Sequence, residues 1–173
     1  MPHQPATRAD LLSLLDEIGV AHRTIDHPPV FTVEEGADLK RRERGGHSKN
    51  LFLKDKKDRL YLAVALGETR VDLVGLGKRI GAAGRLSFGA PELMTATLGV
   101  RPGAVTPFAL INEAARALSA VILDSALLAH DPVWFHPLEN TASTAVAPAG
   151  LDRFLRHCGF RPLIVDLAAP KEG

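Results

Sequence analysis

Two short apolar segments separated by five polar residues constrain the fold of this chain more than any other feature. Residues 50–54 and 60–65 have the pattern of strands, and residues 55–58, Asp-Lys-Lys-Asp, have the composition of a hairpin loop. Strands joined by so short a loop run antiparallel. We therefore expect an α+β fold with a mostly antiparallel or mixed sheet, rather than a doubly wound parallel sheet.

Further helix and strand patterns are interleaved irregularly along the chain, which supports the α+β assignment. Thr7 and Asp10 form a capping box for a helix over about residues 7–18, and Pro91 suits the first turn of another helix. Other helices are expected at residues 33–44, 71–80 and 151–158. Other strands are expected at residues 22–26, 106–111, 120–124, 133–136, 144–147 and 163–166.

The length of 173 residues, with 46% hydrophobic and 24% charged residues, predicts one globular domain over residues 1–173. Cys158 is the sole cysteine, so no internal disulfide can form and a reducing compartment is expected. The sequence carries neither a signal-peptide pattern nor an apolar run long enough to span a membrane. We therefore expect a cytoplasmic protein without membrane attachment. Aromatic residues make up 5%, which argues against a large stacking surface for single-stranded nucleic acid.

Positive charge is concentrated in residues 40–59, where nine basic residues face three acidic ones in a chain of net charge +1. Such a segment predicts a basic face that docks an anionic partner. Its centre, residues 45–48, is uncharged and leads into Lys49 at the start of the expected strand. A lysine fixed there could pair with a phosphate or polarise a carbonyl, and the alternative is an ordinary surface lysine.

Two other places could carry chemistry. His136 follows Trp134 and Phe135 at the end of an apolar strand, where an imidazole could orient a hydroxyl or a water; a purely structural histidine is equally open. Residues 103–107 place a glycine and a proline four apart, which suits a loop that brings backbone amides near a ligand. No nucleophile elbow or metal-ligand cluster is present, Cys158 fits a helix core, and His27 is interpreted as structural.

Four ordered segments together resemble one family. They are residues 27–32 (HPPVFT), 48–55 (SKNLFLKD), 103–107 (GAVTP) and 135–138 (FHPL), with Asn140 and Thr144. The set resembles the YbaK/ProX-type freestanding homologues of the prolyl-tRNA synthetase editing domain, over about residues 20–166. Within that family the chain looks most like the branch that hydrolyses Ala-tRNA(Pro), with a Cys-tRNA(Pro) branch as the nearest competitor.

The resemblance implies a curved mixed sheet with flanking helices and no metal or organic cofactor. It implies that Lys49 contacts the terminal adenosine near the ester, that Asn50 helps to hold that end, and that His136 lies in the pocket. The partner would be a mischarged proline tRNA, and docking on prolyl-tRNA synthetase is left open. The substrate-binding residues would be Thr32, Gly103, Ala104, Val105, Thr106 and Pro107. The tRNA backbone would contact Arg41, Arg42, Arg44, Lys54, Lys56 and Lys57.

The chemistry implied by the resemblance uses water and the ribose hydroxyl of the tRNA, which agrees with the missing serine or cysteine nucleophile. A small pocket would accept alanine and exclude the proline ring. Two alternatives stay open: a tRNA- or nucleic-acid-binding protein without catalysis, and an editing-like domain that has lost activity. The combination of Lys49, residues 103–107 and His136 argues against the first alternative, because a protein that only binds would not need it. No member of the motif set is obviously missing, which argues against the second alternative.

Overall fold

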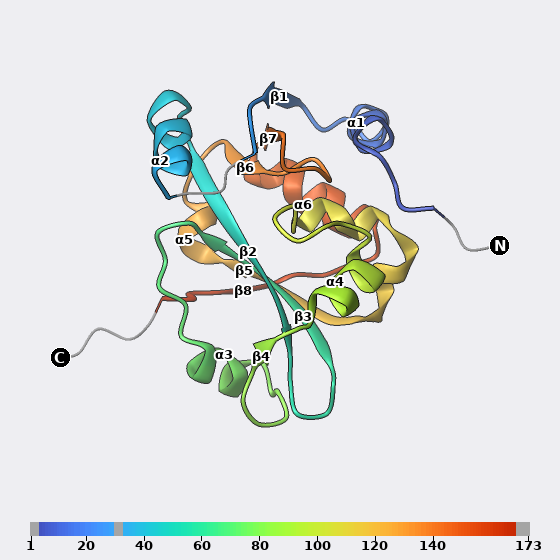
Figure 1. Ribbon diagram of the computed structural model, residues 1–173, viewed down its shortest axis with the longest axis vertical. Coiled ribbons are helices and arrows are strands. Elements are labelled where there is room, and N and C mark those ends of the chain that lie inside the picture. Colours follow the sequence, from blue (N-terminus) through green and yellow to red (C-terminus); the bar gives the residue numbers. More distant parts are fainter. Residues whose placement is uncertain (1–3, 30–32, 169–173) are drawn as a thin grey trace.

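The computed structural model describes residues 4–29 and 33–168. Within them the chain forms one eight-stranded sheet with helices on both faces (Figure 1). The strands are β1 (His22–Asp26), β2 (Gly46–Lys54), β3 (Leu60–Leu66), β4 (Ser87–Phe88), β5 (Leu118–Asp124), β6 (Val133–Phe135), β7 (Ala142–Val146) and β8 (Leu163–Val165). The helices are α1 (Arg8–Glu17), α2 (Val33–Arg42), α3 (Leu73–Arg79), α4 (Pro91–Leu98), α5 (Ser125–Leu128) and α6 (Pro148–His157), with 3-10 helices η1 (Pro107–Ile111) and η2 (Glu113–Ala117).

Strand β2 is the centre of the sheet because it pairs with three other strands. The strand order is β1-β7-β6-β2-β3-β5-β8, and β4 also pairs with β2. The β1–β7, β6–β7, β2–β3 and β2–β4 pairs are antiparallel, whereas β2–β6, β3–β5 and β5–β8 are parallel. The α+β fold with a mixed sheet is therefore confirmed, as are the hairpin between β2 and β3 and the Thr7–Asp10 capping box of α1.

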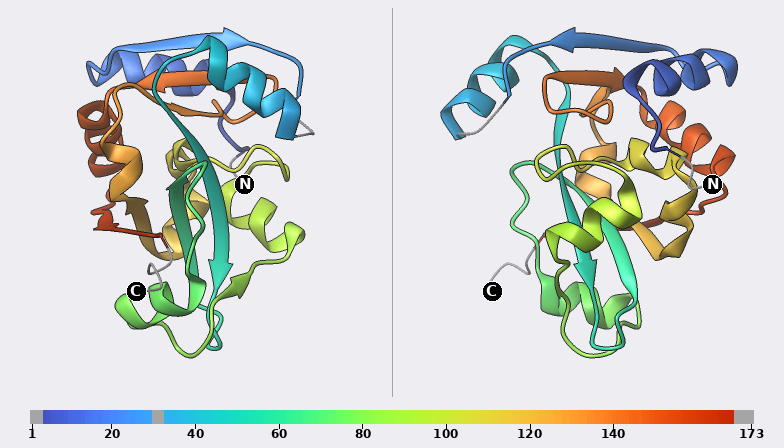
Figure 2. Two further views of the ribbon diagram at one scale, coloured as in Figure 1. Left: turned by 90° about the vertical axis from the view of Figure 1, so that its left-hand side faces the viewer. Right: turned by 45° about the vertical axis from the view of Figure 1, so that its right-hand side comes forward.

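Side-chain alternation along β2 and β3 gives the sheet two different faces. Phe52, Leu62 and Val64 belong to the larger hydrophobic core, which α1, α4, α6 and η1 complete. Leu53 and Ala63 belong to a smaller core that α3 closes. We call these the core face and the α3 face. The left view of Figure 2 shows β2 and β3 between α2 at one end and α3 at the other.

One edge of β2 has no partner strand along its middle, as far as the described residues show. Strand β6 pairs with the first two residues of β2, and β4 pairs with its last two. Ser48 ends the pairing with β6, because its Oγ donates a 2.7 Å hydrogen bond to the carbonyl oxygen of Trp134. The amide of Gly89 donates to the carbonyl of Phe52 at 3.0 Å, so the part of this edge without a partner strand runs from Ser48 to Leu51, roughly 10 Å. We call this stretch of the β2 edge, between the end of β6 and β4, the edge gap.

Asp55 fixes the hairpin loop between β2 and β3. Its carboxylate accepts hydrogen bonds from Nε of Arg59 at 2.9 Å, the hydroxyl of Tyr61 at 3.0 Å and the amide of Ala83 at 3.0 Å. Burial alone would raise the pKa of Asp55, but these hydrogen bonds outweigh it and hold the pKa well below its usual range. The amide of Lys56 also donates to the carbonyl of Ala83 at 2.8 Å. The loop is thus tied to the segment that leads into β4.

Strand β2 is longer than the sequence indicated. It begins at Gly46, so residues 46–49 are part of the strand rather than a break before it. Glycine and serine have weak strand preference, but pairing with β3 and β6 overrides it here. A Cβ at Gly46 would lie 2.9 Å from the Cβ of His130, so a larger residue would crowd the entry to this strand.

The expected strand over residues 106–111 is wrong. Pro107–Ile111 is the 3-10 helix η1, which begins where the Oγ1 of Thr106 accepts a 3.2 Å hydrogen bond from the amide of Phe108. Pro107 occupies its first turn, where the fixed backbone angle of proline favours a helix and its missing amide costs nothing. Phe108, Ala109 and Leu110 of this run are buried in the core.

Candidate functional site

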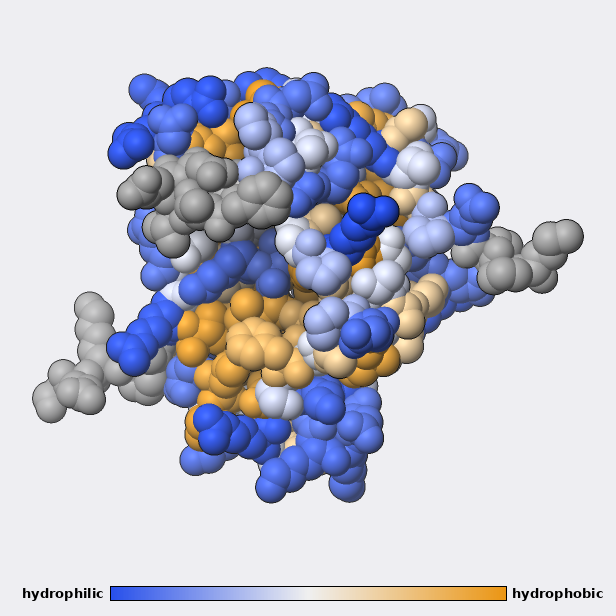
Figure 3. All heavy atoms as spheres, in the orientation of Figure 1, coloured by the Kyte–Doolittle hydropathy of each residue, from blue (hydrophilic) through white to orange (hydrophobic). Residues whose placement is uncertain are grey.

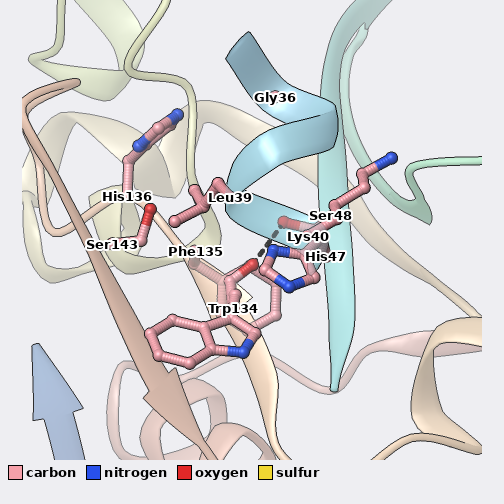
Figure 4. A pocket seen from close by; sticks show the side chains of 9 residues that line it. All are labelled: Gly36, Leu39, Lys40, His47, Ser48, Trp134, Phe135, His136 and Ser143. Carbon is pink, nitrogen blue, oxygen red and sulfur yellow. Dashed lines mark hydrogen bonds between the residues drawn. The ribbon is translucent and has the colours of Figure 1, made fainter. Parts of the chain in front are cut away.

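A cavity of about 120 Å³ lies between α2 and the start of the β2–β6 pair (Figure 4). His47 and Trp134 stack at one end of it, with ring centroids 5.8 Å apart and planes 9° apart. Nε1 of Trp134 donates to the carbonyl of Arg44 at 2.8 Å, and Nε2 of His47 donates to the carbonyl of Glu43 at 2.9 Å. Both aromatic rings are therefore fixed. The cavity is lined by Gly36, Leu39, Lys40, His47, Ser48, Trp134, Phe135, His136 and Ser143.

His136, just after β6, is held as a neutral imidazole. Its Nδ1 lies 3.0 Å from the carbonyl oxygen of Ala142, so Nδ1 carries the proton and donates it. Burial lowers the pKa of His136 below its ordinary value, and the nearby His27 lowers it further. Within the described residues Nε2 has no hydrogen-bond partner, which leaves it as an acceptor at neutral pH. Figure 4 shows the ring directed away from the His47–Trp134 pair.

A second histidine lies close by, in contact with a serine. The rings of His27 and His136 are 6.3 Å apart. Nδ1 of His27 donates to the carbonyl of Pro28 at 2.8 Å, so its Nε2 accepts the hydroxyl of Ser143 at 2.8 Å. His27 does hold β7 in place, as a structural residue would, but it also places a serine hydroxyl on the cavity wall. The other candidate nucleophile, Cys158, is half-buried at the end of α6, and burial raises the pKa of its thiol to about 11.

Lys49 and Asn50 lie beside the edge gap on opposite faces of the sheet. By side-chain alternation Lys49 lies on the same face of β2 as His47 and Leu53, the α3 face, two residues beyond the last residue that pairs with β6. Asn50 alternates to the core face, where its Nδ2 donates to Oγ of Ser48 at 3.3 Å. Among the described residues, Oδ1 of Asn50 is the one buried side-chain N or O atom without a hydrogen-bond partner. Such an atom is costly unless something donates to it.

The loop of residues 103–107 lies next to the turn that follows β6. Gly103 has φ of 93°, and a Cβ there would lie 3.6 Å from Nδ2 of Asn140. The amide of Ala104 donates to the carbonyl of Arg101 at 3.0 Å. At the other end of the loop, Phe108 packs edge-to-face on Phe135 with centroids 5.5 Å apart. The loop is therefore held close to the strand that ends at His136. Ala104, Thr106 and Pro107 are buried, and Val105 is half-buried.

The basic residues do not form the single face that the sequence suggested. Arg41, Arg42 and Arg44 lie at or just after the end of α2, whereas Lys54, Lys56 and Lys57 lie at the hairpin. Strand β2 separates the two groups by roughly 27 Å. Figure 1 shows α2 and the hairpin at opposite ends of the molecule. Thr32 lies outside the described residues.

Two wider properties of the described residues bear on function. Within residues 4–29 and 33–168, no three His, Cys, Asp or Glu side chains are grouped so that they could hold a metal ion. None of the helices in that part of the chain has the length and apolar character needed to cross a membrane.

Comparison with known proteins places the chain in a family. The model of the aminoacyl-tRNA editing domain matches residues 27–154. The chain belongs to this family. It is 36% identical over 163 residues to the Prolyl-tRNA synthetase associated domain-containing protein 1 of Mus musculus, covering 92% of this chain and 95% of the relative. It is also 31% identical over 150 residues to the Prolyl-tRNA editing protein ProX of Acetoanaerobium sticklandii, covering 86% of this chain and 90% of that one.

The fold agrees with this assignment. A crystal structure described as that of a candidate trans-editing enzyme for prolyl tRNA synthetase superposes with a TM-score of 0.72 at 23% identity. The match covers 95% of this chain and 99% of the other. The protein is thus a YbaK/ProX-type editing-domain protein with the mixed sheet of that fold.

The structure brings some of the expected site residues together and separates others. Lys49 and Asn50 lie together in the middle of β2, His136 lies in the wall of the cavity with Ser48, and Gly103 lies next to Asn140 in the turn after β6. Sequence reasoning did not assign a site role to Ser143, Lys40 or His27, all of which lie in or beside the cavity. His27 begins a segment that carried the family resemblance, so a signal existed. For Ser143 and Lys40 the sequence held no signal, because strand register and helix packing place them there.

Proposed function

We propose that this editing-domain protein is a trans-editing deacylase that hydrolyses the ester of mischarged Ala-tRNA(Pro). The observation that carries the proposal is the state of His136: a neutral imidazole on the cavity wall whose Nε2 has no hydrogen-bond partner among the described residues. This is an arrangement that can accept a proton or hydrogen bond from a hydroxyl or water beside an ester. A protein that only binds RNA has no need of it.

In the proposed reaction, water attacks the carbonyl carbon of the aminoacyl ester. The bond between that carbon and the ribose oxygen breaks, free alanine leaves as a carboxylic acid that ionises, and the ribose oxygen takes up a proton. Nε2 of His136 orients the attacking water or the neighbouring ribose hydroxyl. The ammonium of Lys49 stabilises the negative charge that develops on the carbonyl oxygen.

Asn50 and the loop of residues 103–107 would hold the substrate from the core face. The buried Oδ1 of Asn50 needs a donor, and the α-ammonium of the aminoacyl group or a ribose hydroxyl supplies one. Lys49 and Asn50 are consecutive residues on opposite faces of β2, so they would contact different parts of the ester end. The closely packed loop would position the terminal ribose and set the wall of the pocket.

Selectivity for alanine over proline would come from steric exclusion of the proline ring. The 120 Å³ cavity is bounded by fixed aromatic rings, so it accepts a methyl group more readily than a proline ring. Cys-tRNA(Pro) is the second candidate substrate, because cysteine adds only a sulfur to alanine. A tRNA-binding protein without catalysis is the alternative of a different class, and the unpaired lysines of the hairpin would serve it equally well.

The test is a deacylation assay with four substrates: Ala-tRNA(Pro), Cys-tRNA(Pro), Pro-tRNA(Pro) and Ala-tRNA(Ala). We expect the alanyl ester of proline tRNA to be cleaved fastest and the prolyl ester to survive. Faster cleavage of the cysteinyl ester would show that Cys-tRNA(Pro), not Ala-tRNA(Pro), is the preferred substrate. If all four esters decay as in buffer while the tRNA still binds, the non-catalytic alternative is correct.

Ser143 provides an internal test of the chemistry. If water is the nucleophile, Ser143→Ala should retain activity within about threefold, because only a hydrogen bond to His27 is lost. If the Ser143 hydroxyl attacked the ester, the same variant would lose nearly all activity and wild-type enzyme would form an acyl intermediate. Mass spectrometry of wild-type protein quenched during turnover separates the two routes.

A further inference from the structure

Phe88 is an aromatic side chain that the fold leaves in solvent. It is 63% exposed, and it is the one exposed aromatic residue in the part of the chain that the structure describes. Strand β4 needs only its backbone to pair with β2, so the ring is not required for that pairing. Figure 3 shows apolar residues gathered over the region where α3, β4 and the sheet lie in Figure 1, with hydrophilic residues above and below.

The position of Phe88 relates it directly to the proposed site. It is paired with Leu53 of β2, so its side chain lies on the α3 face of the sheet, the face that carries Lys49. Strand β4 forms the lower border of the edge gap, and the end of β6 forms the upper border. Lys49 is four residues from Leu53, or about 13 Å along β2. Phe88 and Lys49 thus lie on the same edge and the same face of β2, about 13 Å apart along the strand.

The surroundings of Phe88 are basic. Lys56 is tied to the segment leading into β4 through its hydrogen bond to Ala83, and Arg85 lies in that segment, whereas Lys54, paired with Ser87, faces the other side of the sheet. Within the described residues, Lys54, Lys56, Lys57 and Arg85 form no ion pair. An exposed aromatic ring flanked by unpaired cations is the combination that binds single-stranded nucleic acid, with bases stacked on the ring and phosphates held by the charges.

We infer that Phe88 is a stacking platform for an unpaired base in the 3′ single-stranded end of the tRNA. The inference rests on the proposed function for the identity of the RNA. With the terminal adenosine at Lys49, a span of about 13 Å corresponds to four steps at the stacked spacing of ~3.4 Å, and to three steps or fewer when the single-stranded end is extended, as the proposal requires. The base on Phe88 is therefore one of the unpaired nucleotides that precede the terminal adenosine. Stacking is tolerant of base identity, so this contact would recognise a single-stranded end rather than a sequence.

The experiment measures RNA binding without requiring catalysis. The probes are two uncharged, 5′-fluorescein-labelled acceptor-stem RNAs, one with an unpaired ACCA end and one blunt. Fluorescence anisotropy is read for wild type, Phe88→Ala, Phe88→Trp and a matched control, Ile164→Ala. Ile164 is 60% exposed on β8, at the opposite edge of the sheet.

We expect Phe88→Ala to weaken binding of the ACCA stem about 10-fold and to leave the blunt stem unchanged. Phe88→Trp should bind the ACCA stem as tightly as wild type, and Ile164→Ala should behave as wild type with both RNAs. Because stacking releases no counterions, Phe88→Ala should keep the wild-type slope of affinity against salt. Equal binding of the ACCA stem by wild type and Phe88→Ala overturns the inference. The inference is also overturned if Phe88→Ala loses equal affinity for both RNAs, or if wild-type protein binds neither RNA.

Failure of this inference and failure of the proposed function give different results. If wild type cleaves Ala-tRNA(Pro) and Phe88→Ala does so with unchanged KM and kcat, the deacylase stands and the platform does not exist. If wild type cleaves no ester but the ACCA stem depends on Phe88, the platform stands and the protein is a binder of single-stranded RNA ends.

Discussion

The two ends of β2 carry similar numbers of cations but use them differently. At the α2 end, Arg41 and Arg42 both approach Asp38, at 3.8 and 3.5 Å. Arg23 pairs with Glu43 at 2.6 Å and its guanidinium lies 5.0 Å from the centre of the Trp134 ring. At the hairpin end, Lys54, Lys56 and Lys57 have no ion pair within the described residues. Of the two acidic residues there, Asp55 is turned inward and holds the loop in shape, and Asp58 is exposed.

This difference teaches that a basic segment is a poor measure of the charge available to a ligand. At the α2 end, part of the positive charge is paired with nearby carboxylates, and Lys40 lies in the wall of the cavity. The hairpin presents its lysines on a loop whose shape is fixed before any partner arrives. A phosphate backbone should therefore meet the hairpin first, and the α2 end should act on what enters the cavity.

Lys49, between the two ends, should have the largest effect. Lys49→Ala is expected to reduce kcat/KM for Ala-tRNA(Pro) roughly 100- to 1000-fold, because the charge that stabilises the developing oxyanion is lost. The melting temperature should stay at the wild-type value, since the side chain is only half-buried and makes no ion pair within the described residues. Lys54→Ala is the matched control, with less than about a threefold effect on kcat. Equal effects of the two variants would remove the distinction between Lys49 and its basic neighbours.

His136 should have the next largest effect, and a dependence on pH that identifies its role. His136→Asn keeps a donor for the Ala142 carbonyl but removes the Nε2 acceptor, so we expect about a 100-fold loss of kcat. Because the neutral imidazole is the active form and its pKa is lowered, wild-type activity should be flat around pH 7 and fall only below the usual histidine range, near 6.5. The residual activity of the variant should lack that acidic limb. A limb of the same shape in both proteins would assign it to another group.

The comparison of the two ends is tested most directly by paired substitutions. The double variant Lys56→Ala/Lys57→Ala should weaken tRNA binding about 10-fold at low salt and reduce the salt slope by about one to two. Arg41→Ala/Arg42→Ala removes the same formal charge but should change affinity less than about twofold, because those side chains are already paired. Affinities measured over a series of salt concentrations decide the matter. An equal salt slope for both double variants would show that the two ends serve the tRNA alike.

Asp55 should have the smallest effect on the reaction but a visible effect on stability. Asp55→Asn weakens the acceptor for Arg59, Tyr61 and Ala83, so the melting temperature should fall while kcat is nearly unchanged. Since the pKa of Asp55 is held below its usual range, its stabilising effect is complete above about pH 4 and is lost as the pH falls further. Wild type should therefore lose more stability than the variant on acidification below that pH. Parallel melting curves for the two proteins would contradict this assignment.

Much of the fold could be predicted from the sequence because local signals and packing agree. The Thr7–Asp10 box, Pro91 and the polar loop at residues 55–58 each specify their element without help from distant residues. Residues 106–111 could not be assigned in this way. An apolar run of that length fits a strand or a buried helix equally well, and a side-chain cap from Thr106 decided the outcome.

The candidate site was predictable only in part. The family motifs locate Lys49, Asn50 and His136, but the edge gap between them arises from strands that meet β2 from distant parts of the chain. The sequence also contains no indication that Asn50 turns to the core face or that Ser143 reaches His27. The basic residues within 40–59 were expected on one face. Strand β2 instead carries the two halves of that segment to opposite ends of the molecule.

The most direct test of the central claim is a time course of alanine release from Ala-tRNA(Pro) held in large excess over the protein. We predict many turnovers per protein molecule with wild type, free tRNA(Pro) that can be charged again with proline, and no release above buffer with Lys49→Ala. Release that stops at one alanine per protein, or that proceeds equally with Lys49→Ala, would contradict a catalytic deacylase centred on the edge gap.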